Sequence, residues 1–494
     1  MKTLFWNFWK HYPALYFGLS LLIGVSIALT HSLSPLIVLF SYIFFRREFL
    51  VAFLLTLCGY LYTAHILPPP LPQNLSLKGT GLFHIRSISP CSSFQKRLLY
   101  HGEFIRFTTE TNETLSSIPA FFFLTNPTER SRITANHIYQ LSGELKVMRP
   151  TSFFFKLDKK LGFKKKEKTF SLVEIRYKVK KTIASFLEEK IPHPPSFAFL
   201  NGLITGNLDD RLLKFSFSRL GLQHVMAISG SHFAFLIYLL SFVLHRFLTK
   251  RKSLFVLLFF VNLYFLFIGP APSIQRAYLM VQVFLFAQIF SKKSYSLNAL
   301  GCALFVAIVI DPFIVQDIGF QLSFLCTGAL ILGTPLFSSL LSTVFKKREE
   351  APTFFHQVVY KTSSLLKEAL SLSLAINLWI LPLLLYDFHK FPLLSLLYNL
   401  FFPLLSFLPL LFLIFSLLAH LFLPFLAPLC YWITTFVTKL TIDLVLYPPA
   451  PFEATLFSSQ FPMEFLILYW SLLFLGFIYW KEKQKSEKEF FVFL

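Results

Sequence analysis

The chain has 494 residues, of which 55% are hydrophobic, only 14% are charged and 64 are phenylalanine. Soluble domains are usually about 45 to 50% apolar, so this composition excludes an ordinary soluble protein and places most of the chain in a lipid bilayer. The formal net charge of +21 does not by itself indicate a nucleic-acid partner, because the cytoplasmic loops of membrane proteins collect Lys and Arg.

Apolar runs of the length that a bilayer requires recur from one end of the chain to the other. A membrane-spanning helix needs about 20 residues, and we expect a polytopic α-helical membrane protein with about twelve spans. The first run is long and no small-residue cleavage site closes it, so we expect an anchor rather than a cleaved signal peptide. The runs lie near residues 13–30, 33–45, 49–67, 232–248, 253–268, 277–290, 296–312, 318–338, 367–386, 393–419, 421–446 and 464–480.

Basic residues predict how these spans are oriented. They cluster in six segments that fall on one side of the membrane if the helices alternate, and short cytoplasmic loops are enriched in Lys and Arg. We therefore predict that both termini lie in the cytoplasm and that segments 67–191, 269–275, 312–316, 387–392 and 447–462 lie outside. The six basic segments contain Lys2 and Lys10, Arg46 and Arg47, residues 245–252, Lys292 and Lys293, residues 346–350, and residues 481–488.

Residues 68–170 are expected to form a separate extracytoplasmic domain between the N-terminal helices of residues 1–67 and the later spans. The segment opens with the proline-rich run 68–72, which is typical of a stiff linker. Four stretches then alternate apolar and polar residues and carry Gly at bends, a pattern that predicts strands. A small β-barrel of about five strands, of the oligonucleotide/oligosaccharide-binding (OB) kind, fits this length. An immunoglobulin-like sandwich would need about seven strands.

A basic run follows at Phe153–Lys168, where seven lysines interleave with aromatic residues. Such a run can neutralise the phosphates of a nucleic acid while the rings stack on bases. It can equally be a solvated hairpin or lie on anionic lipid headgroups, and the sequence leaves both interpretations open. The candidate contacts to a DNA backbone are Lys156, Lys159, Lys160, Lys164, Lys165, Lys166 and Lys168.

Residues 171–195 predict an amphipathic helix and a linker. Apolar residues recur at helical spacing opposite a polar face, so we expect the helix to lie on the membrane surface. The prolines of the segment IPHPP, residues 191–195, end it. The apolar face comprises Leu172, Ile175, Val179, Ile183 and Phe186.

Polar residues within the later spans gather in one half of the membrane under this topology. A single polar residue near a helix end is commonly a capping or snorkelling group. Because several converge on one leaflet, beside prolines that can break the helices, we predict a polar vestibule open to the outside. The set comprises His224, Ser229, Gly230, His232, Ser273, Arg276, Asp317, Gln321, Asp387 and Asn399.

The segment QHVMAISGSHF, residues 223–233, also raises the possibility of chemistry. Ser229 could act as a nucleophile with His224 or His232 as base, in a membrane-embedded hydrolase or transferase. The serine lacks a GxSxG setting, however, and no acid that would orient the base can be assigned. The two histidines do not share a helix face and neither HExxH nor CxxC occurs, so we expect no metal site and no cofactor.

Four passages carry a resemblance to a known family. They begin at Gly202 (GLITGNLDDRLLKFSFSRLGLQHVMAISGSHF), Gly269 (GPAPSIQRAYLM), Asn298 (NALGCALFVAIVIDPFIVQDIGFQLSFL) and Leu381 (LPLLLYDFHKFPLLSLLYNLFFPLL). In order, spacing and content they are similar to the ComEC competence proteins, the membrane channels of bacterial DNA internalisation. The resemblance implies a channel domain over residues 196–481, followed by a cytoplasmic tail over residues 482–494.

The same resemblance implies a function and partners. It predicts a bacterial cytoplasmic (inner) membrane protein that threads one DNA strand inward, with the predicted vestibule residues along the path. The expected partners are single-stranded DNA, membrane lipids, an extracytoplasmic helix-hairpin-helix DNA receptor and a cytosolic helicase-like ATPase; a homo-oligomer is left open. Many relatives continue into a metallo-β-lactamase-like nuclease domain, whereas no such metal motif follows the last span here, so we expect a non-enzymatic channel. A permease for another small or polymeric solute is the alternative.

Overall fold

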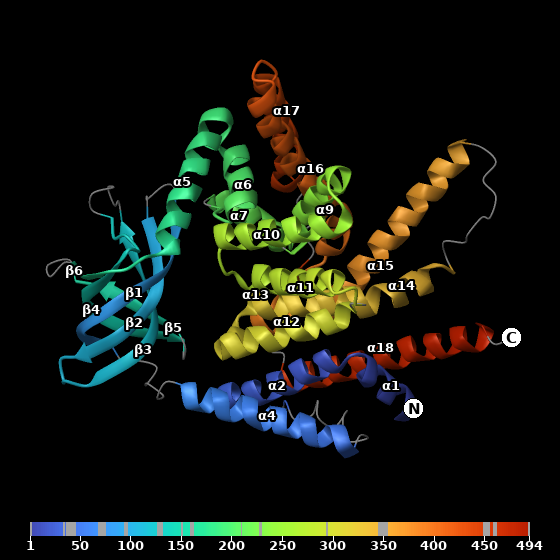
Figure 1. Ribbon diagram of the computed structural model, residues 1–494, viewed down its shortest axis with the longest axis horizontal. Helices are drawn as coiled ribbons and strands as arrows, with labels where there is room; N and C mark the ends of the chain where they lie inside the picture. Colours follow the sequence, from blue (N-terminus) through green and yellow to red (C-terminus); the bar gives the residue numbers. More distant parts are fainter. Residues whose placement is uncertain are drawn as a thin grey trace.

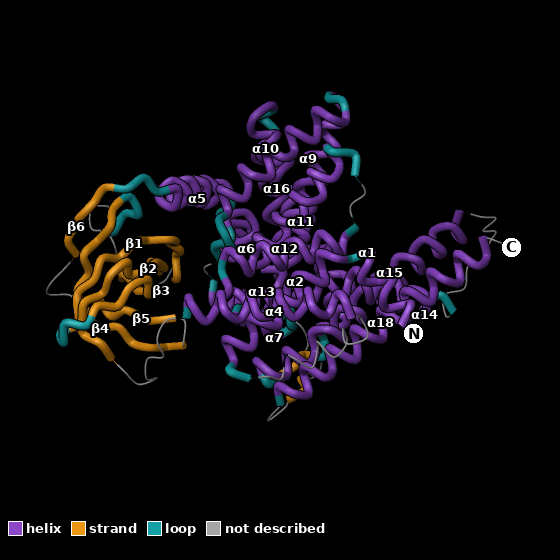
Figure 2. The backbone as a smooth tube through the Cα atoms, turned by 60° about the horizontal axis from the view of Figure 1, so that its bottom comes forward, coloured by secondary structure: helices purple, strands orange, loops and turns teal. Residues whose placement is uncertain are grey.

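A sheet domain lies at one end of a large helical assembly, and both chain termini lie at the opposite end (Figure 1). Apart from one short strand pair among the helices, the strands are confined to that domain, as Figure 2 shows. The computed structural model describes residues 2–32, 35, 46–67, 76–92, 97–125, 132–149, 152–158, 163–208, 210–226, 230–292, 295–343, 354–447, 455–457 and 462–492.

The helices coincide with the expected apolar runs. Seven described helical segments are long and apolar enough to cross a membrane, and shorter apolar helices cover residues 50–66, 232–247 and 296–310. The prediction of a multi-pass membrane protein is therefore confirmed, whereas the run at 33–45 lies, except for residue 35, outside the described residues. The seven segments are Pro13–Thr30, Lys250–Ile268, Ile318–Leu341, Lys361–Phe388, Ser395–Phe422, Ala427–Leu446 and Met463–Gln484.

The helical elements form an N-terminal group and a larger group after the sheet domain. The N-terminal group is α1 (Lys2–His11), α2 (Pro13–Thr30) and α4 (Arg46–Ile66). After the sheet domain come α5 (Leu172–Lys190), α6 (Pro194–Thr205), α7 (Arg211–Arg219), α8 (Gln223–Met226), α9 (Gly230–Phe247), α10 (Lys250–Ile268), α11 (Pro272–Ile289), α12 (Ser296–Ile310), the 3-10 helix η2 (Pro312–Gln316), α13 (Ile318–Gly328), the π-helical η3 (Ala329–Gly333), α14 (Thr334–Leu341), α15 (Phe354–Phe388), α16 (Ser395–Phe422), α17 (Ala427–Leu446) and α18 (Met463–Val492).

Contacts at the two ends of α12 relate the chain termini to the sheet domain. At its start, the Asn298 side chain donates a hydrogen bond to the carbonyl of His11, 2.9 Å away. Lys481 of α18 lies over the ring of Tyr12 at the same end, 4.8 Å from its centroid. At the other end of α12, the Tyr62 hydroxyl donates to the carbonyl of Val309 at 2.8 Å. Because Tyr62 nearly ends α4, the helix that leads to the sheet domain, α12 runs from the end with the termini to the end with the strands.

The described part of the sheet domain contains six strands, one more than the sequence predicts. They are β1 (Ser76–Ser92), β2 (Arg97–Thr109), β3 (Thr114–Thr125), β4 (His137–Arg149), β5 (Ser152–Leu157) and β6 (Phe163–Lys168). The pairings follow the circuit β1–β2–β3–β5–β4–β1, in which only β3 and β5 are parallel, and β6 adds to β4. Alternate residues point inward and form an aromatic core that includes Phe83, Phe104 and Phe122.

Helix α5 (Leu172–Lys190) lies within the predicted segment 171–195, and its first turns are fastened to the sheet domain. The carboxylate of Glu174 is only 2% exposed and accepts hydrogen bonds from both terminal nitrogens of Arg132 and from the Ala135 N–H. The same guanidinium lies over the ring of Tyr177, 4.3 Å from its centroid. A buried ion pair is stable only where such additional contacts satisfy both partners, so this junction is rigid.

The opposite face of α5 is fastened to α10. Arg176 Nε donates to the carbonyl of Leu266, and Lys180 Nζ donates to the carbonyl of Ile268, each at 2.9 Å. These carbonyls belong to the last turn of α10, where no intrahelical partner remains for them. Burial, and secondarily the charge of Arg176, lowers the pKa of Lys180 from 10.5 to about 8. Helix α5 therefore connects the sheet domain to the end of a candidate span.

The expected apolar face of α5 divides into two parts. Leu172, Ile175 and Val179 are exposed, as a helix on a membrane surface requires. Ile183 and Phe186 instead pack against the pair α16 and α17, which lies on the same side of the molecule as α5 and α6 (Figure 1). Protein therefore covers the C-terminal half of the apolar face of α5, whereas its N-terminal half is exposed. A second contact between distant segments is the strand pair β7 (Lys390–Pro392) and β8 (Thr455–Phe457).

Candidate functional site

Arg276 lies at the centre of a polar cluster between three helices. It occupies the first turns of α11, and its Nε donates a hydrogen bond to the Ser323 hydroxyl of α13 at 2.7 Å. Its Nη1 donates to the hydroxyl of Thr327, one turn further along α13, and lies 3.9 Å from the sulfur of Met280. Ser323 and Thr327 share a helix face because they are four residues apart. Two hydroxyls of one span therefore fix the guanidinium.

Gly230 brings a third helix against the same guanidinium. It is the first residue of α9, and a Cβ atom built on it would lie 2.6 Å from Nη2 of Arg276. A side chain at position 230 would require the guanidinium to shift away from Ser323 and Thr327, so glycine suits this close approach of α9. Gly230 and Arg276, which the sequence separates by more than forty positions, thus lie in one site.

The electrostatics of this cluster are unusual for a buried cation. Arg276 is half-buried, and among the described residues no carboxylate pairs with it and no hydrogen-bond acceptor contacts Nη2. A buried charge costs free energy unless it is paired, and hydroxyls supply orientation but no countercharge. Within the membrane such a residue is retained where it meets a partner ion or a water-filled path. The arrangement can bind an anion that comes from outside the chain.

The two predicted histidines have different surroundings. His224 lies in the short helix α8 and is exposed. His232 belongs to α9, is only 2% exposed, and its ring packs against Phe407 of α16 with centroids 5.2 Å apart. Ser229 lies outside the described residues. The described part of the chain contains no group of three potential metal ligands.

Asp317 and Gln321 organise the start of α13. The Asp317 carboxylate is exposed and caps the helix, accepting a hydrogen bond from the Phe320 N–H at 2.9 Å. The Gln321 amide donates to the carbonyl of Val315 at 2.8 Å. These two predicted residues therefore hold the helix that carries Ser323 and Thr327. Aspartate is one of the residues preferred at the N-cap of a helix, where its carboxylate accepts a hydrogen bond from a backbone N–H of the first turn.

Asp387 and Asn399 lie where α15 passes into α16. Both are half-buried, and the oxygen of the Asn399 side chain is buried without a hydrogen-bond partner among the described residues. The turn before α8 reaches this region: a Cβ on Gly221, whose φ is +71°, would lie 2.7 Å from Cβ of Ser395. Ser273, also half-buried, lies one turn before Arg276 on α11. The structure thus brings Gly230 and Arg276 into direct proximity. It also places the turn before α8 against the start of α16.

Ser323 and Thr327 were missed as contacts of the arginine. Ser323 is part of the quoted passage QDIGFQLSFL, but no signal in that passage separates it from a serine that bonds to its own helix. Their spacing of four residues, on one face of a span that begins beside Arg276, is the signal that could have identified the pair.

The sheet domain carries a second candidate surface. Four aromatic side chains from β2, β3 and β5 contact one another outside the core, with centroid separations from 5.6 to 6.1 Å. We call this cluster the aromatic patch; it comprises His101, Phe121, Phe123 and Phe154. Lys156 on β5 and the lysines Lys164, Lys165, Lys166 and Lys168 on β6 are exposed, whereas Lys159 and Lys160 lie outside the described residues. Accessible rings and exposed lysines on one domain are typical of proteins that bind single-stranded nucleic acid.

The fold therefore defines a multi-pass membrane protein with a sheet domain at one end and, among the described residues, an arginine between helices that no carboxylate pairs with. Comparison with known proteins identifies the family. A family model described as Competence protein matches residues 207–483, more than half of the chain, and includes both Gly230 and Arg276. The chain belongs to the competence protein family, as the resemblance predicts.

One relative extends this identification. The chain is 32% identical over 227 residues to ComE operon protein 3 of Bacillus subtilis, strain 168. The match covers 44% of this chain and 26% of that protein, so it spans about a quarter of the length of the relative. No solved structure matches the chain.

Proposed function

We propose that this protein conducts one strand of DNA across the bacterial cytoplasmic membrane during natural transformation. The observation that carries the proposal is Arg276, a half-buried cation held by two hydroxyls and by no carboxylate among the described residues. It lies in the segment that matches the competence family. A DNA strand supplies the missing negative charge, one phosphate per nucleotide, and a guanidinium is well suited to bind it.

Passage of a polymer requires contacts that are weak and independent of sequence. Ser323 and Thr327 hold the guanidinium by Nε and Nη1 and leave Nη2 directed at the start of α9. Each phosphate can pair with that nitrogen and then be replaced by the next, because nothing in the contact reads a base. His224 and Asn399, on the adjacent α8 and α16, are further candidates for the path, together with His232, Ser273, Asp317, Gln321 and Asp387.

Capture of the strand outside the membrane is assigned to the sheet domain. We infer that it is a β-barrel of the OB kind, which the closed circuit of five strand pairings supports. The aromatic patch offers faces on which bases can stack, and Lys156 together with Lys164, Lys165 and Lys166 of β6 attracts the phosphates. In this arrangement the domain is extracytoplasmic and the termini are cytoplasmic. Their location at opposite ends of α12 supports that topology, and the basic segments support about twelve spans in all.

The proposal requires partners and no chemistry from this chain. An extracytoplasmic helix-hairpin-helix receptor would deliver the DNA, and a cytosolic helicase-like ATPase would draw the strand inward, since no GxxxxGK[ST] motif occurs in the sequence. The role of the channel is then to lower the cost of moving a polyanion through the bilayer. Membrane lipids surround it, and we propose that it acts without cofactor or catalysis.

The test compares two arginine variants in a transformable strain that lacks its own competence channel and is complemented by this gene. Arg276→Gln is expected to lower the amount of labelled DNA that reaches the cytosol at least about tenfold. A tenfold change corresponds to a loss of about 1.4 kcal/mol of binding free energy. Surface-bound DNA and membrane abundance should not change. The matched control is Arg246→Gln, an exposed arginine near the end of α9. Normal uptake by Arg276→Gln at normal abundance would contradict the proposal.

A further inference from the structure

A pocket lies at the junction between the sheet domain and α5. Its volume is about 370 Å³, and it is lined by Asn136, Lys168, Thr169, Phe170, Ser171 and Ile175. One wall is fixed by a hydrogen bond from the Thr169 N–H to the carbonyl of Asn136 at 2.8 Å. The polar side chains of the lining include the exposed Lys168 and the half-buried Asn136, both of which can contact a ligand.

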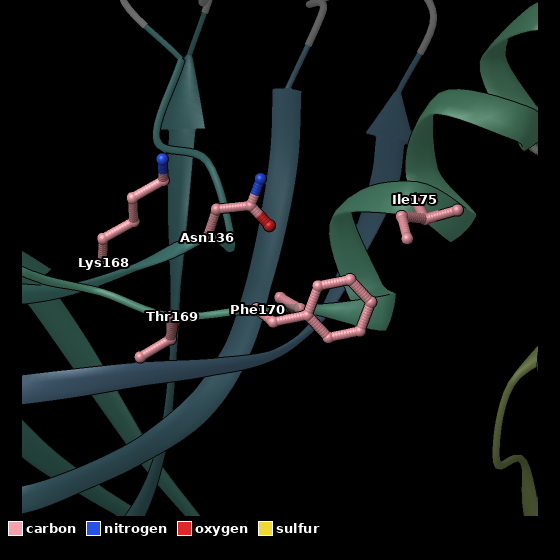
Figure 3. Close-up of a pocket in the computed structure, with 6 residues that line it drawn as sticks. Asn136, Lys168, Thr169, Phe170 and Ile175 are labelled. Carbon is pink, nitrogen blue, oxygen red and sulfur yellow. The ribbon is translucent and has the colours of Figure 1, made fainter.

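The lining of this pocket is amphipathic. Figure 3 shows Lys168 and Asn136 next to each other on the side of the sheet, with Phe170 and Ile175 on the side of the helix. The Phe170 ring is 81% exposed, and Leu172, Ile175 and Val179 continue the apolar surface along α5 with exposures between 42 and 48%. In a soluble protein these four neighbouring apolar side chains would be exposed to water, which is unfavourable. Their exposure here indicates contact with the hydrocarbon of a membrane.

Contacts with α10 define where this apolar surface lies relative to the membrane. Arg176 and Lys180 bind the carbonyls of Leu266 and Ile268, which end a candidate span. Terminal carbonyls of a span lie at the boundary between hydrocarbon and headgroups. Ile175 and Val179 immediately precede the two basic residues, so α5 holds the apolar surface at that boundary. Lipid molecules are the surroundings available to it there.

Charge then indicates which lipid fits. Lys168 is exposed and forms no ion pair with the described residues, and β6 as a whole carries four lysines and one glutamate. Such a segment at a membrane surface favours anionic headgroups. A DNA strand would satisfy the lysines, but its bases would not cover the aliphatic side chains of Leu172, Ile175 and Val179. The combination of cation, amide and hydrocarbon surface matches an amphiphile with a phosphate.

We propose that this junction pocket binds an anionic phospholipid of the surrounding bilayer. The phosphate lies against Lys168 and the Asn136 amide, and the upper part of an acyl chain lies along Phe170 and Ile175. The bound lipid seats the sheet domain on the leaflet next to it and assigns Lys168 to lipid rather than to DNA. This proposal does not depend on DNA conduction, because it concerns a surface that lies outside the cluster around Arg276.

The test is photo-crosslinking of the full chain in vesicles of phosphatidylcholine with and without phosphatidylglycerol. A benzoylphenylalanine replaces Phe170, whose high exposure makes the substitution compatible with folding, and lipid adducts are identified by mass spectrometry. The control places the same group at Phe123, an exposed phenylalanine of the same domain outside the pocket. We expect adducts with phosphatidylglycerol, enriched over its share of the bilayer, at position 170 and far fewer at position 123.

A charge variant completes the test. Lys168→Glu is expected to lower the share of phosphatidylglycerol among the adducts at position 170 at least about fivefold, because each lysine near an anionic leaflet has about that effect on binding. Total lipid adducts should persist. Equal crosslinking at positions 170 and 123, or adducts that follow the mixing ratio of the two lipids, would overturn the proposal. So would loss of the lipid adducts in favour of an added single-stranded oligonucleotide, which would assign the pocket to DNA.

Discussion

Two arginines of this protein occupy buried positions with opposite electrostatic surroundings. Arg132, between the sheet domain and α5, meets the carboxylate of Glu174 and the face of Tyr177. Although burial lowers the pKa of Arg132, its hydrogen bond and charge interaction with Glu174 raise that pKa above its ordinary value. Arg276, between α9, α11 and α13, meets two hydroxyls and a sulfur, and no carboxylate among the described residues.

The difference indicates which of the two charges is structural. A cation that already has its anion gains nothing from a second one, and its removal leaves a buried carboxylate. A cation held only by neutral groups is oriented but not neutralised, and its electrostatic free energy falls when an anion arrives. The arginine at the domain junction therefore fixes the fold, whereas the arginine among the spans has no countercharge among the described residues, which is the basis of our proposal that it binds a passing phosphate.

The largest expected effect follows from breaking the first pair. Glu174→Gln keeps the shape of the side chain but leaves Arg132 without its countercharge, and breaking a buried pair in this way costs about 3 to 5 kcal/mol. We expect hydrogen exchange of residues 132–136 and 172–178 in the full chain to accelerate strongly. The double variant Arg132→Gln, Glu174→Gln should recover most of the protection, since neither charge then remains buried. Equal loss in the single and double variants would contradict a structural ion pair.

Lys180 offers an intermediate case, a buried cation held by a backbone carbonyl that, unlike arginine, can lose its proton. Its pKa is about 8 in the folded protein against an ordinary 10.5, so between these values the unfolded chain binds more protons and stability rises with pH. Relative to Lys180→Gln, the wild type should gain about 2 kcal/mol between about pH 7 and pH 9.5. Thermal unfolding of both proteins at the two pH values measures this difference. If the two proteins differed in their free energy of unfolding by the same amount at both pH values, the amine of Lys180 would be solvated in the folded protein.

The sequence predicted strands and membrane spans, because each follows from a regular pattern of apolar and polar residues. Alternation of apolar and polar residues located β1 to β4, and continuous apolar runs located the spans, because burial in a sheet core or in lipid determines those residues one by one. The pairing of a sixth strand, β6, with β4 and the packing of Ile183 and Phe186 against α16 and α17 were not predicted. Both depend on contacts between distant segments, and a lipid-facing position and a protein-facing one carry the same apolar residue.

The sequence also predicted only part of the candidate site, namely the residues that are unusual in an apolar run. Arg276 stands out because a charge in an apolar run is costly, and Gly230 and His232 stand out beside it. Ser323 and Thr327 do not, since serine and threonine within a helix commonly bond to its backbone, as Thr327 also does here with the carbonyl of Ser323. The pair Arg132 and Glu174 joins residues 42 positions apart, and no local pattern reveals it.

The smallest expected effect tests the close approach of α9 to Arg276. In Gly230→Ala the new Cβ would lie 2.6 Å from Nη2, while Ser323 and Thr327 prevent the guanidinium from moving freely. We expect a loss of about 1 kcal/mol from this overpacking. In an Arg276→Lys background, which has no Nη2, the same substitution should be neutral or stabilising, since alanine is the better helix former. The matched control is Gly476→Ala in α18, whose Cβ would meet nothing within 4 Å. A double-mutant cycle of thermal unfolding measures the coupling free energy between positions 230 and 276. If Gly230→Ala lowered the free energy of unfolding equally in both backgrounds, the need for glycine at position 230 would not come from Arg276.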